Sequence, residues 1–292
     1  MSGASPREAF AAAKVNLFLH VGPRAADGYH PIASLIVFAD LGDRLTLERA
    51  GGSPPLCIEG PFAAGLSNGE DNLVLRAYRT WGSPGAFRFL LDKQLPLASG
   101  LGGGSADAAA ALRLLNASLA EPRAPAELRR VARSLGSDVA ACLASEAVVA
   151  TGRGDQLRPA PDFPDLAGLL VNPGVASPTA DVYRAFDERR RSETADLPAL
   201  RDRYDAGELV RLVVETRNDL EGAALALQPT IGEALAVLRE QPETLAARMS
   251  GSGASVFALC AGGREAGALA ERLAAARPDW WVRACRLGSG PK

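Results

Sequence analysis

Residues 97–107 read Leu-Ala-Ser-Gly-Leu-Gly-Gly-Gly-Ser-Ala-Asp and run directly into an alanine- and leucine-rich segment that ends near Asn116. The glycines between Gly100 and Gly104 leave the backbone free to adopt positive φ and to approach a ligand without Cβ clashes. The segment that follows is typical of a helix, and a helix N-terminus carries about half a unit of positive charge. Successive N–H groups beside such an N-terminus suit a polyphosphate. The stretch therefore predicts a phosphate-binding loop, in which Ser105 is expected to cap the helix or to reach a metal-bound phosphate oxygen.

The stretch does not fully match any of three well-known glycine-rich nucleotide-binding motifs. A Walker A loop ends in Gly-Lys-Ser/Thr, whereas Gly104 is followed by Ser105 and Ala106. A protein kinase loop needs His-Arg-Asp and Asp-Phe-Gly segments further along, and the sequence contains neither. A dinucleotide fingerprint nearly fits residues 100–105, but no acidic residue ends a following strand at the right distance. A nicotinamide-dependent oxidoreductase stays open as an alternative, and it predicts NAD(P)H binding without ATP binding.

The composition is that of an ordinary globular enzyme. The chain has 292 residues, 47% of them hydrophobic and 23% charged, with a formal net charge of -2. This length predicts two domains or lobes, and this balance excludes global disorder and disfavours a dedicated nucleic-acid binder. No apolar run is long enough for a membrane span, and the N-terminus lacks the pattern of a signal peptide. Four widely spaced cysteines exclude the common zinc spacings. We therefore expect a cytoplasmic enzyme.

Strand-like and helix-like segments alternate without a regular βαβ period, which favours an α+β fold. Strands are predicted at residues 14–21, 32–38, 44–48, 87–91, 166–171, 255–260 and 281–285. Helices are predicted at residues 71–81, 105–116, 126–135, 208–216, 230–240 and 265–277. A turn is expected at residues 40–43, and residues 187–204 are expected to form a solvated helix or loop. Three prolines between residues 158 and 164 argue against regular structure there. They place a lobe boundary that divides the chain into residues 1–160 and 161–292.

Together with Pro96, the glycine loop resembles the P-x-x-x-G-L-G-S/G-S-S/G motif of the GHMP kinase superfamily. Four further blocks, at residues 13–20, 24–30, 135–139 and 248–257, follow in an order and spacing similar to the 4-diphosphocytidyl-2-C-methyl-D-erythritol kinase family. The resemblance implies a two-lobed α+β fold with the active site in the cleft between the lobes. It also implies ATP and Mg²⁺, and phosphorylation of the 2-hydroxyl of the cytidine diphosphate-linked methylerythritol. A homoserine- or mevalonate-type kinase, and a non-catalytic nucleotide-sensing module, remain as alternatives.

The same resemblance assigns roles to individual residues. It implies a catalytic pair, Lys14 and Asp138, in which the carboxylate takes the proton of the acceptor hydroxyl and the lysine keeps it ionised. The expected ATP-binding residues are Asn72, Pro96, Leu97, Ala98, Ser99, Gly100, Leu101, Gly102, Gly103, Gly104, Ser105 and Ala106. The expected substrate-binding residues are Asn16, Asp27, Gly28, Tyr29, His30, Thr179, Tyr183, Ser250, Gly251, Ser252 and Gly253. Tyr29 and Tyr183 are expected to stack on opposite faces of the cytosine, and His30 to read its edge.

Two departures from the family pattern bear on the site. Residues 140–142 are Ala-Ala-Cys where the family usually has a proline and an aromatic residue, so we expect a roomier site behind Asp138. Ala106 stands where many relatives carry a second serine, which removes one hydroxyl contact to phosphate or Mg²⁺. The metal ligands are not identified from sequence. The expected partner is a small-molecule substrate, with no nucleic acid and no membrane, and the chain is expected to be a monomer or homodimer.

Overall fold

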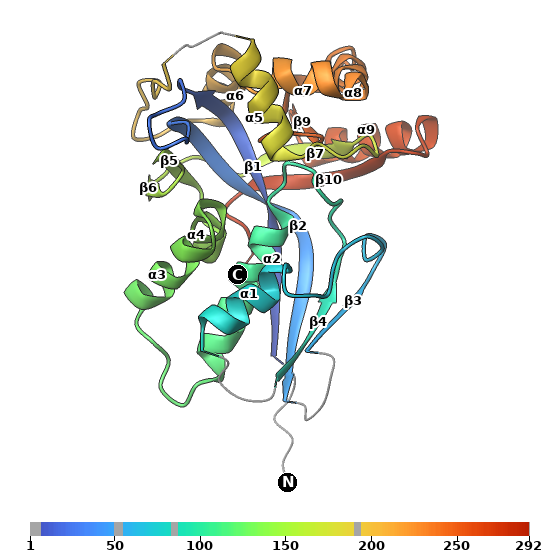
Figure 1. The fold of residues 1–292 in the computed structure, drawn as a ribbon. Coiled ribbons are helices and arrows are strands. Elements are labelled where there is room, and N and C mark those ends of the chain that lie inside the picture. Colours follow the sequence, from blue (N-terminus) through green and yellow to red (C-terminus); the bar gives the residue numbers. More distant parts are fainter. Residues whose placement is uncertain (1–6, 50–54, 83–86, 190–193, 292) are drawn as a thin grey trace.

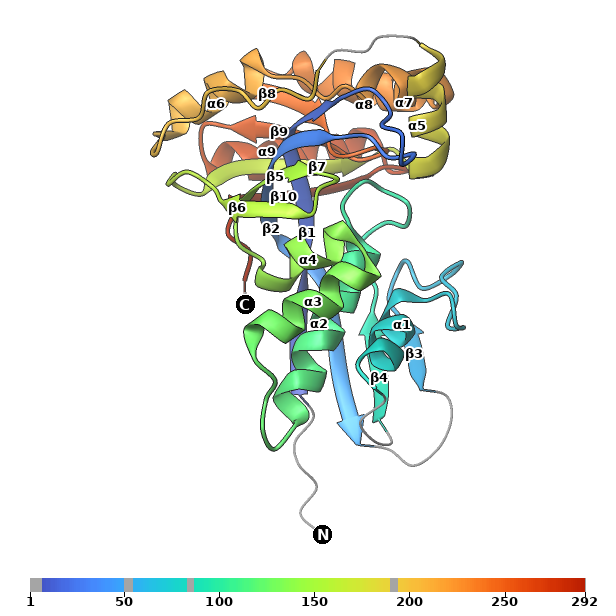
Figure 2. The ribbon, with the colours of Figure 1, turned by 60° about the vertical axis from the view of Figure 1, so that its left-hand side comes forward.

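The computed structural model describes residues 7–49, 55–82, 87–189 and 194–291. Its frame is one mixed sheet with helices packed along it in two groups (Figure 1). Helices α1 to α4 (residues 73–144) gather along the half of the molecule that holds β3 and β4 (residues 56–92), and α5 to α9 (residues 179–276) cover the half that holds β7 to β10 (residues 166–288) (Figure 2). The strands β1 and β2 run through both halves, so residues of the two groups of helices can meet at one place along them.

Within the described residues the sheet has ten strands, in the order β3-β4-β2-β10-β7-β9-β8, with β1 also paired to β2 and β5 paired to both β2 and β6. All these pairs are antiparallel except β3 with β4. The strands are β1 (Arg7–Val21), β2 (Ile32–Arg49), β3 (Leu56–Glu59), β4 (Phe87–Asp92), β5 (Val148–Gly152), β6 (Gln156–Pro159), β7 (Leu166–Asn172), β8 (Thr244–Met249), β9 (Val256–Cys260) and β10 (Trp281–Gly288).

The helices are α1 (Leu73–Thr80), α2 (Gly103–Ser118), α3 (Pro125–Leu135), α4 (Ser137–Ala144), α5 (Thr179–Glu188), α6 (Ala206–Glu215), α7 (Glu221–Leu227), α8 (Pro229–Arg239) and α9 (Gly263–Ala276). Helix α2 is buried almost all round, because a run of alanines from Ala108 to Ala111 lets its backbone approach β1 and β2 closely. The glycine loop therefore leads into a helix that the core holds rigidly.

The predicted turn at residues 40–43 is wrong, because β2 continues through it. Gly42 pairs with Ala12 of β1 in the ladder, and the side chain of Asp43 is fully buried rather than facing solvent. The Asp43 carboxylate accepts hydrogen bonds from the backbone N–H groups of Gln94 and Leu95, at 2.6 and 2.8 Å. A sequence that looks like a polar turn is therefore a strand segment whose acid fixes the entry to the glycine loop.

Other expectations differ from the structure in smaller ways. Strand β1 begins at Arg7 rather than at residue 14. Strand β6 includes Arg158 and Pro159, so the proline-rich segment is partly regular. Residues 194–204 contain no helix, which agrees with the loop alternative expected for residues 187–204, and residues 190–193 lie outside the described part of the chain. The predicted helices and the remaining predicted strands occur within a few residues of their expected ends. Among the described residues no helix combines the length and apolarity needed to cross a membrane.

Candidate functional site

A cleft of about 1070 Å³ opens between the two groups of helices. Its wall comes from β1, from the loop between β1 and β2, from the glycine loop and from the starts of α4 and α5. The sequence-predicted residues that line it are Lys14, Asn16, Gly28, Tyr29, His30, Asn72, Pro96, Leu97, Ala98, Ser99, Gly100, Gly102, Gly103, Gly104, Ser105, Asp138, Thr179, Tyr183, Gly251 and Ser252. The predicted residues outside the lining are Asp27, Leu101, Ala106, Ser250 and Gly253. Segments far apart in the chain thus share one cleft.

Three left-handed backbone positions shape the glycine loop, Ala98 at φ +46° and two glycines. Gly100 has φ +74° and Gly102 has φ +64°, values that favour glycine. A Cβ on Gly100 would lie 2.3 Å from the backbone oxygen of Ser250, so this position also needs the close approach of two backbones. The carbonyl of Leu101 accepts a 2.8 Å hydrogen bond from the Lys14 N–H, which fixes the loop to β1. The loop is therefore held between β1 and the turn after β8.

Helix α2 begins at Gly103, two residues earlier than predicted, and its N-cap is Gly102 rather than Ser105. The first bond of the helix runs from the Ala106 N–H to the Gly102 carbonyl, at 2.9 Å. The N–H groups of residues 103–105 precede that ladder, as the first N–H groups of any helix do. Ser105 lies in the first turn on the cleft wall. This end of α2 has the geometry of an anion site.

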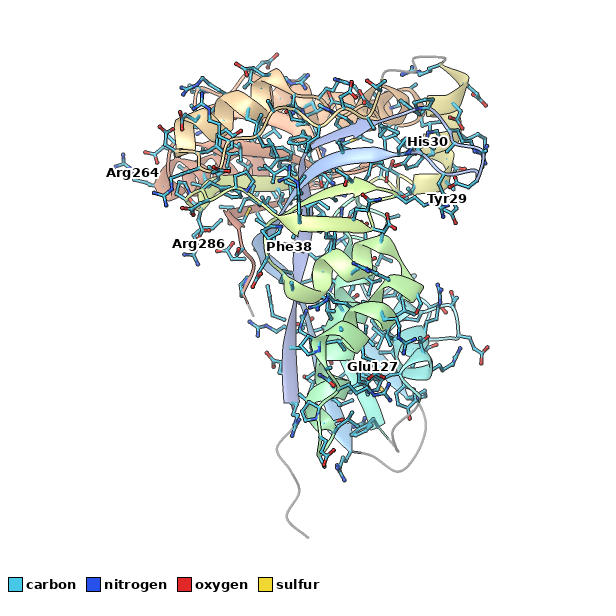
Figure 3. The ribbon with its side chains drawn as sticks, turned by 90° about the vertical axis from the view of Figure 1, so that its left-hand side faces the viewer. Tyr29, His30, Phe38, Glu127, Arg264 and Arg286 are labelled. Atoms are coloured by element: carbon cyan, nitrogen blue, oxygen red, sulfur yellow. The ribbon has the colours of Figure 1, made fainter. Side chains whose placement is uncertain are left out.

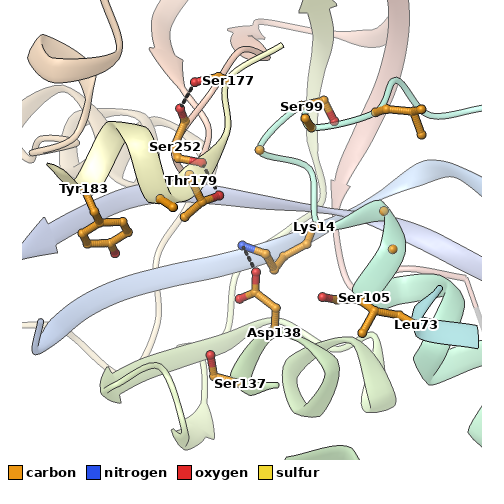
Figure 4. A pocket seen from close by; sticks show the side chains of 18 of the residues that line it. Lys14, Leu73, Ser99, Ser105, Ser137, Asp138, Ser177, Thr179, Tyr183 and Ser252 are labelled. Carbon is orange, nitrogen blue, oxygen red and sulfur yellow. Dashed lines mark hydrogen bonds and ion pairs between the residues drawn. The ribbon is translucent and has the colours of Figure 1, made fainter. Parts of the chain in front are cut away.

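Lys14 and Asp138 lie side by side in the cleft (Figure 4). The Lys14 Nζ is 3.7 Å from the Asp138 Oδ2 and donates a 2.8 Å hydrogen bond to the Asn16 Oδ1. The lysine is buried, whereas the Asp138 side chain is 50% exposed and lies in the first turn of α4. The pair stands between Tyr183 on one side and Ser105 and Leu73 on the other (Figure 4). The carboxylate therefore faces the cleft beside a buried ammonium group and is open to a group bound there.

Asn16 is fixed by contacts that leave its amide oxygen for the lysine. Its Nδ2 donates to the Ser34 Oγ at 2.7 Å, and its backbone N–H donates to the Ser250 Oγ at 3.2 Å. Ser34 in turn donates to the Phe18 carbonyl at 2.5 Å. This buried chain of hydrogen bonds orients the Lys14 amine toward Asp138.

The loop between β1 and β2 carries Tyr29 and His30 to the far end of the cleft (Figure 3). The His30 Nδ1 donates to the Gly22 carbonyl at 2.9 Å, and its Nε2 is 3.2 Å from the Asp187 Oδ1. The His30 ring also packs against Tyr183, with ring centroids 5.1 Å apart. Burial, with a smaller effect of Asp138, raises the pKa of Tyr183 to about 12. Tyr29 differs from its neighbour, since 58% of it is exposed.

The segment that leads into α5 meets the serine-rich turn between β8 and β9 on the side of the cleft opposite Asp138 (Figure 4). The Ser177 hydroxyl donates to the Ser252 carbonyl at 2.7 Å, and the Thr179 and Ser252 hydroxyls are 2.9 Å apart. Asn218 lies behind this turn and donates to the carbonyls of Met249 and Gly251 at 2.9 and 2.8 Å. The turn is therefore shaped by partners from three segments of the chain.

Asn72 lies where the first turn of α1 meets the cleft. Its Oδ1 accepts a 2.9 Å hydrogen bond from the Val74 N–H, which makes it the N-cap of that helix. Its Nδ2 donates to the Ser67 carbonyl at 2.7 Å. The amide of Asn72 is thus occupied by structural contacts even though the residue lines the cleft.

A buried charge cluster that no sequence motif indicates lies beneath the glycine loop. Lys93 donates hydrogen bonds to Asp43 and, at 2.8 Å, to Asp107, and all three side chains are almost fully buried. Lys93 and Asp107 also line the cleft, and the Asp107 Oδ1 is buried without a hydrogen-bond partner in the described structure. Burial raises the pKa of Asp107 to about 7, although the neighbouring Lys93 opposes this. The sequence signal was a lone lysine and a lone aspartate flanking the glycines.

Asp107→Asn should flatten the dependence of stability on pH. Between about pH 4 and pH 7 the unfolded Asp107 has lost its proton, because an exposed aspartate has a pKa of about 3.9, while the folded one retains it. The folded state then binds more protons, so its free energy of unfolding falls as pH rises through this range. Urea unfolding at pH 5, 6, 7 and 8 should show the variant gaining stability relative to the wild type as pH increases.

Asp71→Asn is the matched control for this experiment. Its carboxylate is exposed, and a hydrogen bond from Ser67 lowers the pKa of Asp71, so its contribution to stability is constant above pH 5. A difference between the Asp107→Asn variant and the wild type that does not change from pH 5 to pH 8 would contradict the prediction.

Family models and curated relatives both relate the chain to GHMP kinases. The GHMP kinases N terminal domain matches residues 72–146, and the GHMP kinases C terminal domain matches residues 197–279. The 4-diphosphocytidyl-2-C-methyl-D-erythritol kinase of Caulobacter vibrioides is 53% identical over 286 residues, covering 96% of this chain and 98% of the relative. The enzyme of the same name from Paracoccus denitrificans is 49% identical and covers 96% of each chain.

Solved structures agree on the fold. A crystal structure of 4-(cytidine 5'-diphospho)-2C-methyl-D-erythritol kinase superposes with a TM-score of 0.78 at 35% identity, covering 97% of this chain and all of the other. Homoserine kinase from Cytophaga hutchinsonii has a TM-score of 0.71 at 18% identity, covering 99% and 97% of the two chains, and supports the fold alone. The predicted α+β GHMP kinase fold is confirmed. The chain belongs to the GHMP kinases and, among them, to the 4-diphosphocytidyl-2-C-methyl-D-erythritol kinase family.

Proposed function

We propose that the chain transfers the γ-phosphoryl group of ATP to the 2-hydroxyl of 4-diphosphocytidyl-2-C-methyl-D-erythritol. One observation carries the proposal: the Lys14–Asp138 pair lies in a single cleft with the glycine loop and with the Tyr29–His30 loop. A phosphoryl donor bound on the glycine loop and an acceptor whose cytosine is bound on the Tyr29–His30 loop would meet at the Lys14–Asp138 pair. The names of the relatives support the same acceptor.

The ATP phosphates are proposed to lie on the glycine loop. The N–H groups at the start of α2 and the free end of the helix dipole offer hydrogen bonds and positive charge to the β- and γ-phosphates. Residues 96–100, residues 102–105 and Asn72 border the adjoining part of the cleft, so we propose that the nucleoside lies toward α1. Phosphoryl transfer needs positioning and charge neutralisation more than covalent help, and this loop provides both.

Asp138 is proposed to take the proton of the acceptor hydroxyl as that oxygen attacks the γ-phosphorus. Its carboxylate is exposed to the cleft and has Lys14 at 3.7 Å. The lysine stabilises the ionised carboxylate before transfer and neutralises charge near the phosphate during it. The hydrogen bond to Asn16 fixes the amine, so the pair is organised before substrate arrives.

The cytosine is proposed to stack on Tyr29 at the open end of the cleft. A pyrimidine has a flat π face and polar edges, so it needs an aromatic platform and hydrogen-bonding groups beside it. Both ring nitrogens of His30 already have partners, so we propose that its backbone reads the edge of the base. Tyr183 packs against His30 and bounds the second face. Thr179 and Ser252 border the space between the base and Asp138.

Mg²⁺ is proposed to enter with the ATP phosphates. Within the described residues no group of three or more His, Cys, Asp or Glu is placed to hold a metal ion. That pattern fits Mg²⁺, which is commonly bound by one or two protein oxygens together with water and substrate phosphates. The Ser105 hydroxyl on the cleft wall beside the loop is the protein oxygen we propose for it. The ion would neutralise phosphate charge during transfer.

The setting of the enzyme follows from the same proposal. We propose a cytoplasmic enzyme, a setting supported by its four cysteines, all of which are free thiols. The proposed lobe boundary near residue 160 follows β6, after which the chain forms the second group of helices.

A coupled assay of ADP release tests the proposed function. With ATP, Mg²⁺ and 4-diphosphocytidyl-2-C-methyl-D-erythritol we expect turnover, whereas homoserine and mevalonate should give none above the ATPase background. Turnover on homoserine or mevalonate instead would assign the chain to another GHMP kinase activity. ATP binding without turnover on any acceptor would favour the nucleotide-sensing alternative.

A further inference from the structure

The β5–β6 turn, residues 153–155, reaches the Tyr29 loop from a distant part of the chain. Strand β5 pairs with the start of β2, and its last residue Gly152 lies opposite Ile32. This pairing carries Arg153 to the wall of the cleft. No motif in the sequence marks Arg153, and nothing described above uses it.

Arg153 makes two contacts with the Tyr29 loop at once. Its guanidinium carbon lies 4.5 Å from the centre of the Tyr29 ring, within the range of a cation–π interaction. Its Nη2 forms an ion pair with the Asp27 Oδ2. The other oxygen of Asp27 accepts a 2.9 Å hydrogen bond from the Tyr29 N–H. Asp27 therefore joins the arginine to the backbone of the residue whose ring the arginine covers.

We infer that Arg153 is a positioning residue for the cytidine end of the substrate. Tyr29 is 58% exposed, and an exposed tyrosine loses rotamer freedom when a base stacks on it. With the guanidinium on one face and Asp27 holding the backbone, the ring is fixed beforehand and its other face is left for the pyrimidine. The positive guanidinium is attracted to the π electrons of the Tyr29 ring on the face opposite the one left for the pyrimidine. This inference rests on the proposed function, because it assigns the base to Tyr29.

The contact is specific to arginine at this position. The planar guanidinium can stack on the ring while its edge meets Asp27, whereas a lysine ammonium has no plane to stack. A second arginine in the loop, Arg24, has a different role. It donates a 2.9 Å hydrogen bond to the Gly28 carbonyl and so holds the backbone of the loop. Arg153 is thus the group that orders the ring itself.

The test is a double-mutant cycle on Arg153 and Tyr29. Arg153→Ala should raise the KM for the cytidine substrate about three- to fivefold, as expected from the free energy of an exposed cation–π contact, and leave kcat and the KM for ATP within about twofold. Tyr29→Ala should raise the same KM more. In the Tyr29→Ala background, Arg153→Ala should have no further effect, because the arginine then has no ring to position. Arg153→Lys should resemble Arg153→Ala.

Arg158→Ala is the matched control, since Arg158 lies on the same hairpin, is exposed and is not part of the cleft lining. It should leave all three kinetic constants unchanged. An equal effect of Arg153→Ala with and without Tyr29 would overturn the inference in favour of a direct contact between arginine and the substrate diphosphate. A raised KM in Tyr29→Ala with none in Arg153→Ala would also overturn it while leaving the proposed function intact. If the wild type neither turns over the substrate nor binds cytidine diphosphate by calorimetry, both proposals are wrong.

Discussion

Replacing Asp138 by alanine should lower kcat on the cytidine substrate by on the order of 10²-fold or more, which is what a general base contributes. The variant removes the carboxylate that faces the cleft and leaves the phosphate loop in place, because the loop is held by Leu101, Ser99 and Ala98 through their backbone carbonyls. ATP affinity should therefore change little. Steady-state ADP release, combined with calorimetric titration of a non-hydrolysable ATP analogue, measures both quantities.

Asp138→Asn sharpens this experiment, because the amide has nearly the shape of the carboxylate and cannot accept the proton. It should be impaired about as severely as the alanine variant. Asp162→Asn is the control, since Asp162 is an exposed carboxylate paired with Arg203 at 2.8 Å and is not part of the cleft lining. Unchanged turnover in both Asp138 variants would remove Asp138 from the mechanism.

The sequence predicts those features whose physical cause lies within a few neighbouring residues. The four glycines between Gly100 and Gly104 and the alanine run after them are unusual enough to indicate both the loop and its helix. A helix is predicted at residues 71–81, and α1 occupies residues 73–80 of that segment with Asn72 as its N-cap. In these cases the physical cause, a left-handed backbone or an unpaired helix N–H, lies within a few residues of the sequence signal.

Features that depend on distant partners were not predictable in the same way. Asp43 looked like a turn residue because its partners, Gln94 and Leu95, are about fifty positions away and nothing local says that its side chain is buried. The cluster of Asp43, Lys93 and Asp107 combines a strand, a loop and a helix, so no spacing rule applies to it. Arg153 is an ordinary surface residue until the pairing of β5 with β2 brings it to Tyr29.

The long strand β1 sets the position of Lys14 relative to the glycine loop. Lys14 lies opposite Phe38 near a register shift in β1, at the level where β10 also pairs with β2. The glycine loop attaches to β1 at the same residue, through the Lys14 N–H. One backbone position thus fixes the amine and the loop together, so the distance between the phosphate site and the amine is set by a single strand rather than by the contact between two groups of helices.

Gly100→Ala should be among the most damaging substitutions outside the Lys14–Asp138 pair. A Cβ at this position would lie 2.3 Å from the Ser250 oxygen, 2.8 Å from the Gly253 oxygen and 2.9 Å from the Gly253 nitrogen, all of them backbone atoms that have no free rotamer to adopt. The residue also has φ +74°, which an alanine adopts at a cost. Strain and overpacking together should lower the free energy of unfolding by about 2–4 kcal/mol.

The functional loss should exceed the loss of stability. Ser250 and Gly253 belong to the turn that meets the glycine loop, and the Ser250 Oγ donates to the Gly100 carbonyl at 3.1 Å. Separating the two backbones displaces the loop from its observed position against β1, so ATP affinity should fall even at temperatures where the variant remains folded. Thermal unfolding and titration with the ATP analogue measure the two effects separately.

Gly104→Ala is the structural control, because its Cβ would meet only the Leu73 Cδ1, at an ordinary 3.5 Å, within a helix that favours alanine. Equal melting temperatures for the two variants would show that the loop and the turn after β8 are not packed as closely as their backbones indicate.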